Sequence, residues 1–181
     1  VARFLNDKTS LIDVGKVTCR DPSGKKIVRY FMNISTAGVV AHVDYWSNRS
    51  PWFLGPKGAY VYGSLRAMLE YKPAEVVYST NGTNRTVTPL MIIVANGPYF
   101  GSGMKPAPKA RPNDGLFDVV AVEKSSFLQT LNFFPRLYTG SHLKLSQVQS
   151  IRARKVEMTV KNKKRIIPVE ADGDLIGRLP A

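Results

Sequence analysis

Cysteine, histidine and long apolar runs are scarce in this sequence, and each shortage argues against a class of protein. With a single cysteine, Cys19, an internal disulfide cannot form and a cysteine-ligated zinc site is disfavoured, so we expect a reducing, cytoplasmic compartment. No serine or cysteine stands in a nucleophile-elbow setting, so the two histidines, His42 and His142, give no support to Ser/His/Asp or Cys/His catalysis. No apolar run approaches the roughly 20 residues that a membrane-spanning helix needs.

Acidic residues are also few, 13 against 26 lysines and arginines, which gives a net charge of +13. Much of this excess lies between Lys144 and Pro168, where eight bases accompany one acid, Glu157. A basic hairpin here would suit an anionic membrane surface, nucleic acid or a phosphate-bearing ligand. A solvated basic hairpin without a partner explains the same charges, so charge alone leaves the partner open.

Hydrophobic residues make up 44 % of the 181 residues, enough for the packed core of one large domain. Most segments are rich in β-branched and aromatic residues, and two carry apolar residues at helical spacing. We expect strands at 11–19, 26–36, 73–80, 84–90, 91–96, 116–123, 148–160 and 166–169, and helices at 56–72 and 125–138. Asn81-Gly82 indicates a hairpin, and Ser125 or Ser126 should cap the second helix. The pattern predicts a mainly β (α+β) fold, an antiparallel β-sandwich with about two attached helices.

Three of the few acids, Glu170, Asp172 and Asp174, fall within five residues. Alternate residues of an extended strand share a face, so the three carboxylates would lie on one side if Gly173 does not bend the chain. Like charges this close raise one another's pKa or require a cation, which suits a general base or a site for metal-bound phosphate. A solvated strand end is the alternative.

Two loops have features that suit a ligand but also have simpler explanations. Asp114 lies in the turn at 112–116, where its carboxylate and nearby main-chain carbonyls could bind a hard cation such as Mg²⁺, although Asn-Asp-Gly is ordinary turn chemistry. The segment at 96–103 has three glycines and a proline, which let the backbone approach a ligand or another strand closely. A tight bulge explains that segment equally well.

Taken in order, the motifs of this chain resemble those of a known enzyme family. They are Ile12-Asp13-Val14-Gly15, Phe31-Met32-Asn33-Ile34-Ser35-Thr36-Ala37-Gly38, Leu54-Gly55 with Tyr60, Val94-Ala95-Asn96-Gly97-Pro98-Tyr99-Phe100-Gly101-Ser102-Gly103-Met104, Pro108-Lys109-Ala110, Asn113-Asp114-Gly115-Leu116 and Ala171-Asp172-Gly173-Asp174. This order is similar to that of the C-terminal domain of the diacylglycerol kinase, sphingosine kinase and ceramide kinase family, especially its bacterial-type soluble members. The resemblance covers nearly the whole chain.

The resemblance implies a two-domain lipid kinase of which residues 1–181 form the C-terminal, lipid-substrate β-sandwich. The family's nucleotide-binding domain carries a Gly-Gly-Asp-Gly-Thr loop that does not occur in this chain, so ATP would bind through that other domain. The catalytic base of the family corresponds to Asp174, where the family usually has Glu. The structural Mg²⁺ site corresponds to the Asp114 carboxylate with the carbonyls of Arg111 and Leu116.

The resemblance also implies a place for the lipid head group. Sphingosine kinases use an acid that corresponds to Asp44, although Asp44 is equally compatible with a helix cap. The expected reaction is transfer of the γ-phosphoryl group of ATP to a lipid hydroxyl. Asp174 would accept the hydroxyl proton, and Asp172 would support it or help to hold Mg²⁺. Apolar side chains between the two sheets would receive the lipid tail.

Several expectations about partners follow from this reading. The basic hairpin would hold the enzyme, cytoplasmic and peripheral, against an anionic membrane. The isolated chain is not expected to turn over ATP, and the choice among diacylglycerol, sphingosine, ceramide and phosphatidylglycerol stays open, as does a homodimer. One rival interpretation is a non-enzymatic basic β-domain that binds single-stranded nucleic acid, which would not need the acids at 172–174. The other rival is an NAD kinase-like enzyme with a nucleotide acceptor.

Overall fold

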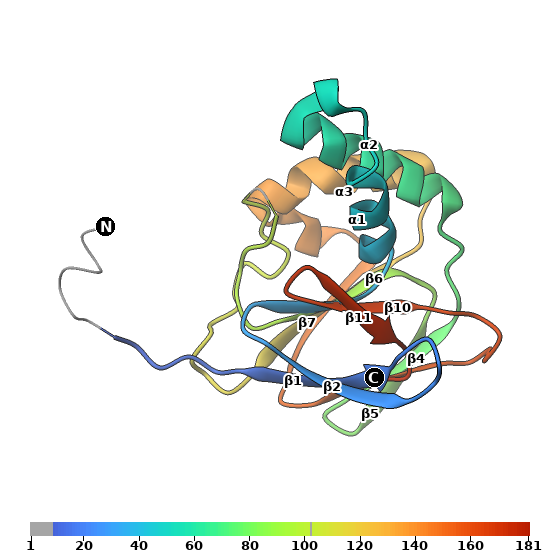
Figure 1. Cartoon of the computed structure of the whole chain (residues 1–181). Helices are drawn as coiled ribbons and strands as arrows, with labels where there is room; N and C mark the ends of the chain where they lie inside the picture. The colour runs from blue at the N-terminus through green and yellow to red at the C-terminus, as the bar shows by residue number, and fades with distance from the viewer. Residues whose placement is uncertain (1–8, 102) are drawn as a thin grey trace.

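The computed structural model describes residues 9–101 and 103–181. Over these residues the chain forms eleven strands, three α-helices and two short 3₁₀-helices (Figure 1). The strands are β1 (Gly15–Arg20), β2 (Lys26–Phe31), β3 (Ile34–Gly38), β4 (Val76–Thr80), β5 (Thr83–Val87), β6 (Pro89–Ala95), β7 (Phe117–Glu123), β8 (Val148–Ala153), β9 (Val156–Val160), β10 (Pro168–Ala171) and β11 (Asp174–Arg178). The helices are α1 (Val40–Ser47), η1 (Trp52–Leu54), α2 (Gly55–Glu70), α3 (Phe127–Thr139) and η2 (Ser141–Lys144).

Two antiparallel sheets form the body of the molecule. The larger has eight strands in the order β2-β1-β11-β10-β3-β6-β7-β8, and the smaller has three in the order β5-β4-β9. Helix α1 packs on β3 and β10, and α2 packs on α1, so these two helices cover part of the larger sheet (Figure 1). The expected mainly β sandwich with attached helices is confirmed, with three α-helices where about two were expected.

Helix α3 begins and ends at the signals in its sequence. The Ser126 hydroxyl accepts a hydrogen bond from the main-chain N–H of Gln129, and the Gln129 side chain accepts one from the Ser126 N–H. This reciprocal pair is a capping box, and it identifies Ser126 rather than Ser125 as the cap. Gly140, with φ of 77°, ends the helix, whereas Pro135 lies inside it without stopping it.

Two hairpins turn on residues with positive φ, and only one of them was expected. Asn81 and Gly82 have φ of 51° and 79° and join β4 to β5, as their sequence predicts. Asp172 and Gly173 have φ of 49° and 94° and join β10 to β11. The expectation that the acids at 170, 172 and 174 share one face of a single strand is therefore wrong, because Gly173 bends the chain.

Three further elements differ from the sequence expectation. Residues 26–36 form two strands, because Met32 and Asn33 turn the chain between β2 and β3. Helix α1 was not anticipated, since its eight residues are too few to establish a helical period. The expected basic hairpin between 148–160 and 166–169 does not form: residues 148–160 divide into β8, which pairs with β7 in the larger sheet, and β9, which pairs with β4 in the smaller one, while β10 pairs with β3 and β11.

The central strands β3 and β10 are covered on both faces, so their side chains enter two different environments. Alternate side chains of a strand point to opposite faces. Thr36 and Glu170 line a cavity beside α1 and α2, whereas Ser35 and Val169 line a cavity beside β9 of the smaller sheet. The larger sheet therefore separates a helix-side cavity from a sandwich-side cavity.

Candidate active site

The helix-side cavity has a volume of about 250 Å³ and brings together four of the segments that the sequence singled out. Helix α1 contributes Asp44, α2 contributes Tyr60, and the glycine-containing loop contributes Phe100 and Gly101. Strands β3 and β10 and the turn after β10 contribute Ile34, Thr36, Glu170, Asp172 and Gly173, and Asn33 and Val40 complete the lining. Three acidic residues, Asp44, Glu170 and Asp172, thus line one small cavity.

Glu170 is the most unusual group in this cavity because its side chain is buried, with the residue only 3 % exposed. Burial, together with the neighbouring Asp44 carboxyl, raises the pKa of its carboxyl to about 8, while the hydrogen bond from the Thr36 hydroxyl opposes the shift. Thr36 Oγ1 donates to Glu170 Oε2 at 2.8 Å. At neutral pH Glu170 is therefore mostly a protonated acid, which can donate a hydrogen bond to Asp44 or to a ligand.

Tyr60 gives the cavity a second neutral polar group. Burial and the nearby carboxyls of Asp44 and Glu170, with Tyr138, raise the pKa of the Tyr60 phenol well above its usual range. The phenol therefore stays protonated at neutral pH. A half-buried O–H near two carboxyl groups is suited to a small polar head group that both donates and accepts hydrogen bonds.

Asp172 has a supporting role in the geometry of this cavity. Its carboxylate accepts hydrogen bonds from the main-chain N–H groups of Met32, Asn33 and Ile34, at 2.7, 3.0 and 2.9 Å. Its own N–H donates to the Ile34 carbonyl at 2.8 Å. These bonds hold the turn between β2 and β3 against the turn between β10 and β11.

Asp174, the expected base, is placed differently from Asp44 and Asp172. It is exposed, it begins β11 opposite Ala171, and it is not among the residues that line the cavity. Its neighbour Gly173 does line the cavity. The structure thus brings Asp44 and Asp172 to one cavity and leaves Asp174 on the exposed surface one residue beyond it.

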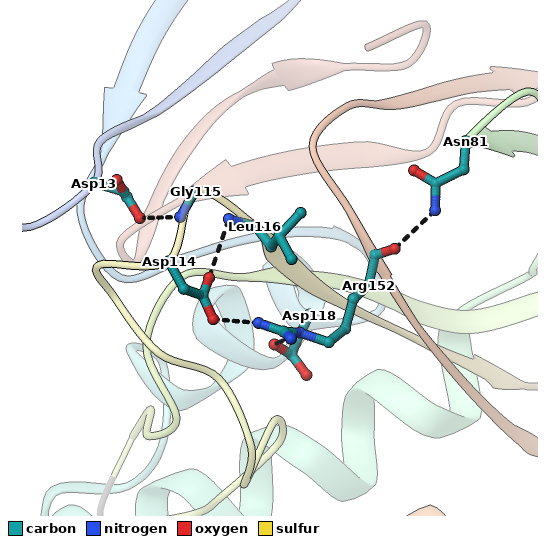
Figure 2. A network of polar contacts seen from close by, with 7 residues as sticks. All are labelled: Asp13, Asn81, Asp114, Gly115, Leu116, Asp118 and Arg152. Carbon is teal, nitrogen blue, oxygen red and sulfur yellow. Dashed lines mark hydrogen bonds and ion pairs between the residues drawn. The ribbon is translucent and has the colours of Figure 1, made fainter.

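The turn that contains Asp114 forms a separate polar network (Figure 2). One Asp114 oxygen pairs with the Arg152 guanidinium, and the other accepts from the Leu116 N–H at 3.1 Å. Arg152 Nε also lies 3.5 Å from Asp118 Oδ2. The pKa of the Asp118 carboxyl is raised, chiefly because the group is buried. The Arg152 guanidinium opposes this shift, and the Asp114 carboxylate adds to it. This network ties the turn to β7 and β8.

The donors at this turn allow a test of the expected Mg²⁺ site. No cluster of three or more His, Cys, Asp or Glu side chains suited to a metal occurs within residues 9–101 and 103–181. Mg²⁺, however, commonly takes only one or two carboxylates and fills its remaining positions with other oxygens and water. The carboxylates of Asp114 and Asp118 fit that kind of coordination. Asp118 Oδ2 is buried and accepts no hydrogen bond from the described residues, so it is free to bind a cation. Arg152 already neutralises part of their charge.

Asn96 connects the Asp114 turn to the cavity. It is fully buried, and its Nδ2 donates to the carbonyls of Asp13 and Met32, each at 2.8 Å. Asp13 Oδ2 in turn accepts from the Gly115 N–H at 2.7 Å (Figure 2). Ser102 of the glycine-containing loop lies outside the described residues, so the expectation for that loop is tested only at its neighbours.

Sequence reasoning found most of this site but not its central feature. It named Asp44, Asp172 and Tyr60, and it noted Glu170 only as one of three clustered acids. The pairing of Asp44 with Glu170 joins residues far apart in the chain through an unanticipated helix. The available signal was the two-residue period, which places Glu170 on the face opposite Val169.

The fold and the cavity together define a two-sheet β-domain with a carboxyl-lined site beneath its helices, suited to a small polar group. The chain belongs to the family described as the YegS C-terminal NAD kinase beta sandwich-like domain, whose model matches residues 33–181. It is 31 % identical over 163 residues to a Bacillus subtilis (strain 168) protein named "Putative lipid kinase YtlR", covering 86 % of this chain and 52 % of that protein.

A second relative agrees with this assignment, and a solved structure shares the fold. A Mycobacterium tuberculosis (strain CDC 1551 / Oshkosh) protein named diacylglycerol kinase is 29 % identical over 174 residues, covering 96 % of this chain and 53 % of that protein. The solved structure described as "A putative diacylglycerol kinase from Bacillus anthracis str. Sterne" has a TM-score of 0.58 at 15 % identity, covering 93 % of this chain and 53 % of that one. The chain spans about half the length of the curated relatives it matches.

Proposed function

We propose that this chain is the C-terminal, lipid-substrate domain of an ATP-dependent lipid kinase. The observation that carries the proposal is the cavity in which Asp44, Glu170 and Tyr60 converge, in a family whose named relatives are lipid kinases. The other half of such an enzyme would supply ATP, which then transfers its γ-phosphoryl group to a lipid hydroxyl. Phosphoryl transfer depends mainly on positioning and charge neutralisation, so the acceptor hydroxyl must be held firmly.

Each acid has a distinct role in this proposal. Asp44 accepts a hydrogen bond from the head group, and the protonated Glu170 donates one. Asp172 positions the Met32–Ile34 segment that borders the cavity. Asp174 remains the proposed base, because an exposed carboxylate one residue beyond the cavity can meet both the acceptor hydroxyl and a γ-phosphate brought by the other domain.

The Mg²⁺ of the proposal is structural and lies at the Asp114 turn. The Asp114 carboxylate with the carbonyls of Arg111 and Leu116 would hold it, and the ion would supply charge neutralisation beside Asp118. Such an ion should raise the melting temperature of the chain when Mg²⁺ is added, and Asp114→Asn should remove that rise. An equal rise in the variant would sink this assignment.

Peripheral membrane contact also belongs to the proposal. Over the described residues, none of the helices is both long and apolar enough to cross a bilayer. At the tip of the helical layer, however, η1 exposes Trp52 (92 %) and Phe53 (70 %), and this segment leads into α2, which carries Tyr60 (Figure 1). Exposed aromatic residues favour the membrane interface, so η1 is a better contact than the expected basic hairpin.

A kinase assay with a panel of acceptors tests the proposed function. The protein that joins this chain to its nucleotide-binding half is incubated with labelled ATP, Mg²⁺ and, separately, diacylglycerol, sphingosine, ceramide, phosphatidylglycerol and NAD. A labelled lipid is expected, and Asp174→Asn should remove most turnover without unfolding the protein. Labelled NADP with no labelled lipid would establish the NAD kinase interpretation instead.

A further inference from the structure

The helix-side cavity has room for a head group but not for a lipid tail as well. Its volume is about 250 Å³, below the range of about 300–1,000 Å³ that is usual for the sites of drug-sized ligands. A long acyl chain is itself as large as such a ligand, so a head group and its tail cannot both lie inside. The tail of a lipid held beside Asp44 therefore has to leave the cavity.

The larger sheet closes one of the ways out. A second cavity, of about 620 Å³, lies between the two sheets and is lined by Ser35 and Val169, whereas their neighbours Thr36 and Glu170 line the helix-side cavity. Strands β3 and β10 pair without interruption at these residues. A tail cannot pass between hydrogen-bonded strands, so an acceptor in the helix-side cavity does not place its tail in the sandwich-side cavity.

Two helices of the helical layer carry exposed apolar side chains in line. On α2 these side chains recur every fourth residue, and on α3 they recur after three and seven residues, so each set forms a stripe on one face of its helix. Each of these side chains is between 38 % and 76 % exposed. The α2 stripe consists of Val61, Leu65 and Leu69, and the α3 stripe consists of Leu128, Leu131 and Tyr138.

Each stripe has one end near the cavity. Tyr60, which lines the cavity, is followed directly by Val61 of the α2 stripe. Tyr138 of the α3 stripe is close enough to Tyr60 to contribute to the raised pKa of its phenol. At 1.5 Å per residue, the α2 stripe extends about 12 Å from Val61 to Leu69, and the α3 stripe about 15 Å from Tyr138 to Leu128. A tail that leaves the cavity past Tyr60 thus meets extended apolar surface.

Charge is scarce on these two helices, although the protein has a net charge of +13. Helix α3 has one charged residue, Arg136. Helix α2 has Lys57, Arg66 and Glu70, and the last two pair with each other at 3.0 Å. Contiguous exposed apolar surface on a soluble protein commonly marks an interaction site. Surface with so little charge suits hydrocarbon and does not suit nucleic acid.

We propose that the acceptor lipid places only its head group in the helix-side cavity, while its acyl chains leave past Tyr60 and lie along the stripes of α2 and α3. This inference rests on the proposed function and adds a substrate class to it. The class is lipids that are recognised by the head group and accepted with chains of different lengths. The same stripes belong to the helical layer whose tip, η1, is the proposed membrane contact (Figure 1).

Paramagnetic NMR on the 181-residue chain locates the tail without requiring kinase activity. The probe is dioctanoylglycerol with a nitroxide at the end of one chain, added to the ¹⁵N-labelled protein below its aggregation concentration. Unlabelled dioctanoylglycerol is the diamagnetic control. The amide signals of Val61, Leu65 and Leu131 should be broadened most. Asp44→Asn should greatly reduce this broadening, because the tail follows the head group.

Three results of this experiment would contradict the inference. Broadening concentrated at Cys19, Phe117 and Met158 would place the tail between the sheets and would leave the kinase proposal intact. Equal broadening in Asp44→Asn would show that the nitroxide binds the stripes without the head group. Broadening of no amide would overturn both the tail assignment and the proposed acceptor site.

Kinetics of the protein that joins this chain to its nucleotide-binding half test the stripes with matched acceptors. Leu65→Ser/Leu131→Ser replaces one exposed leucine on each helix and should raise KM for dioleoylglycerol in vesicles at least fivefold with little change in kcat. KM for dibutyrylglycerol, whose chains are too short to lie along the stripes, should not change. Val28→Ser/Ile166→Ser replaces exposed apolar residues outside the helices and should leave both KM values unchanged.

An equal rise in KM for both acceptors would mean that the two leucines do not act on the tail. Weaker association of the variant chain with its nucleotide-binding half would mean that the other half covers the stripes. Either result would overturn the tail assignment. If the unmodified protein labels no lipid at all, the proposed kinase function fails, whereas the paramagnetic NMR still decides where the tail lies.

Discussion

At the scale of single residues, the site depends on one buried acid whose position the sequence did not reveal. The clustering of acids at 170–174 was evident from the sequence, because the chain has so few of them. The direction of each side chain was not, since it depends on a turn in which Asp172 adopts a positive φ and accepts three main-chain hydrogen bonds that hold the turn in place. The spacing of the acids in the sequence identified the cluster at 170–174. Only the packing of the fold shows that Glu170 is its buried member.

The raised pKa of Glu170 predicts how stability depends on pH. Its folded-state pKa of about 8 exceeds the ordinary value of 4.5 for a glutamate, so its contribution to stability is complete below about pH 4.5 and is lost as pH rises through 8. The free energy of unfolding, measured with denaturant, should be larger at pH 5 than at pH 8.5. This difference should shrink in Glu170→Gln. The exposed Glu75→Gln should keep the parent difference, and an unchanged difference in Glu170→Gln would contradict the assignment.

Asp172 and Asp174 should differ sharply when each is replaced by alanine. Asp172→Ala leaves three main-chain N–H groups without their acceptor and should cost about 2–4 kcal/mol of unfolding free energy. Asp174→Ala, with an exposed side chain, should cost less than about 0.5 kcal/mol. Urea unfolding measures both. Similar losses in the two variants would mean that the supporting role of Asp172 is misassigned.

At the scale of elements, the sequence predicted local structure correctly where all the interacting residues lie within a few positions of one another. The capping box of α3 and the Asn81-Gly82 hairpin each lie within a few residues, and both formed as predicted. The exchange of strands between sheets at 154–155 and the short α1 depend on distant partners, and neither was predicted. The motifs that identify the family are likewise short stretches of neighbouring residues. The approach of Asp44 to Glu170, in contrast, depends on residues far apart in the chain.

The exposed aromatic residues of η1 predict a measurable membrane contact. Trp52→Ala/Phe53→Ala should weaken sedimentation with anionic vesicles by at least about tenfold, because transfer of two aromatic side chains from water is lost. Leu11→Ala/Tyr30→Ala removes exposed apolar residues from other segments and serves as the control. Equal weakening in both double variants would show that η1 has no special part.

At the scale of the whole molecule, the larger sheet separates two chemically different cavities. The cavity on its helix side is lined by carboxyl groups suited to a polar acceptor, and the cavity on its sandwich side is lined by apolar residues that include Cys19, Phe31 and Phe117. The sequence predicted the sandwich, the family and the excess of positive charge. It could not predict this division, because adjacent residues of β3 and β10 serve opposite sites and their spacing in sequence gives no sign of it.

The most direct test of the account is to locate a lipid acceptor on the chain by NMR. Dioctanoylglycerol is titrated into the ¹⁵N-labelled protein, with Asp44→Asn as the variant and Glu75→Gln as the control. We predict amide shifts concentrated at Asn33, Ile34, Thr36, Gly101 and Gly173, present in the control and greatly reduced in Asp44→Asn. Shifts concentrated instead at Cys19, Phe117 and Met158, or equal shifts in Asp44→Asn, would contradict the assignment of the helix-side cavity as the acceptor site.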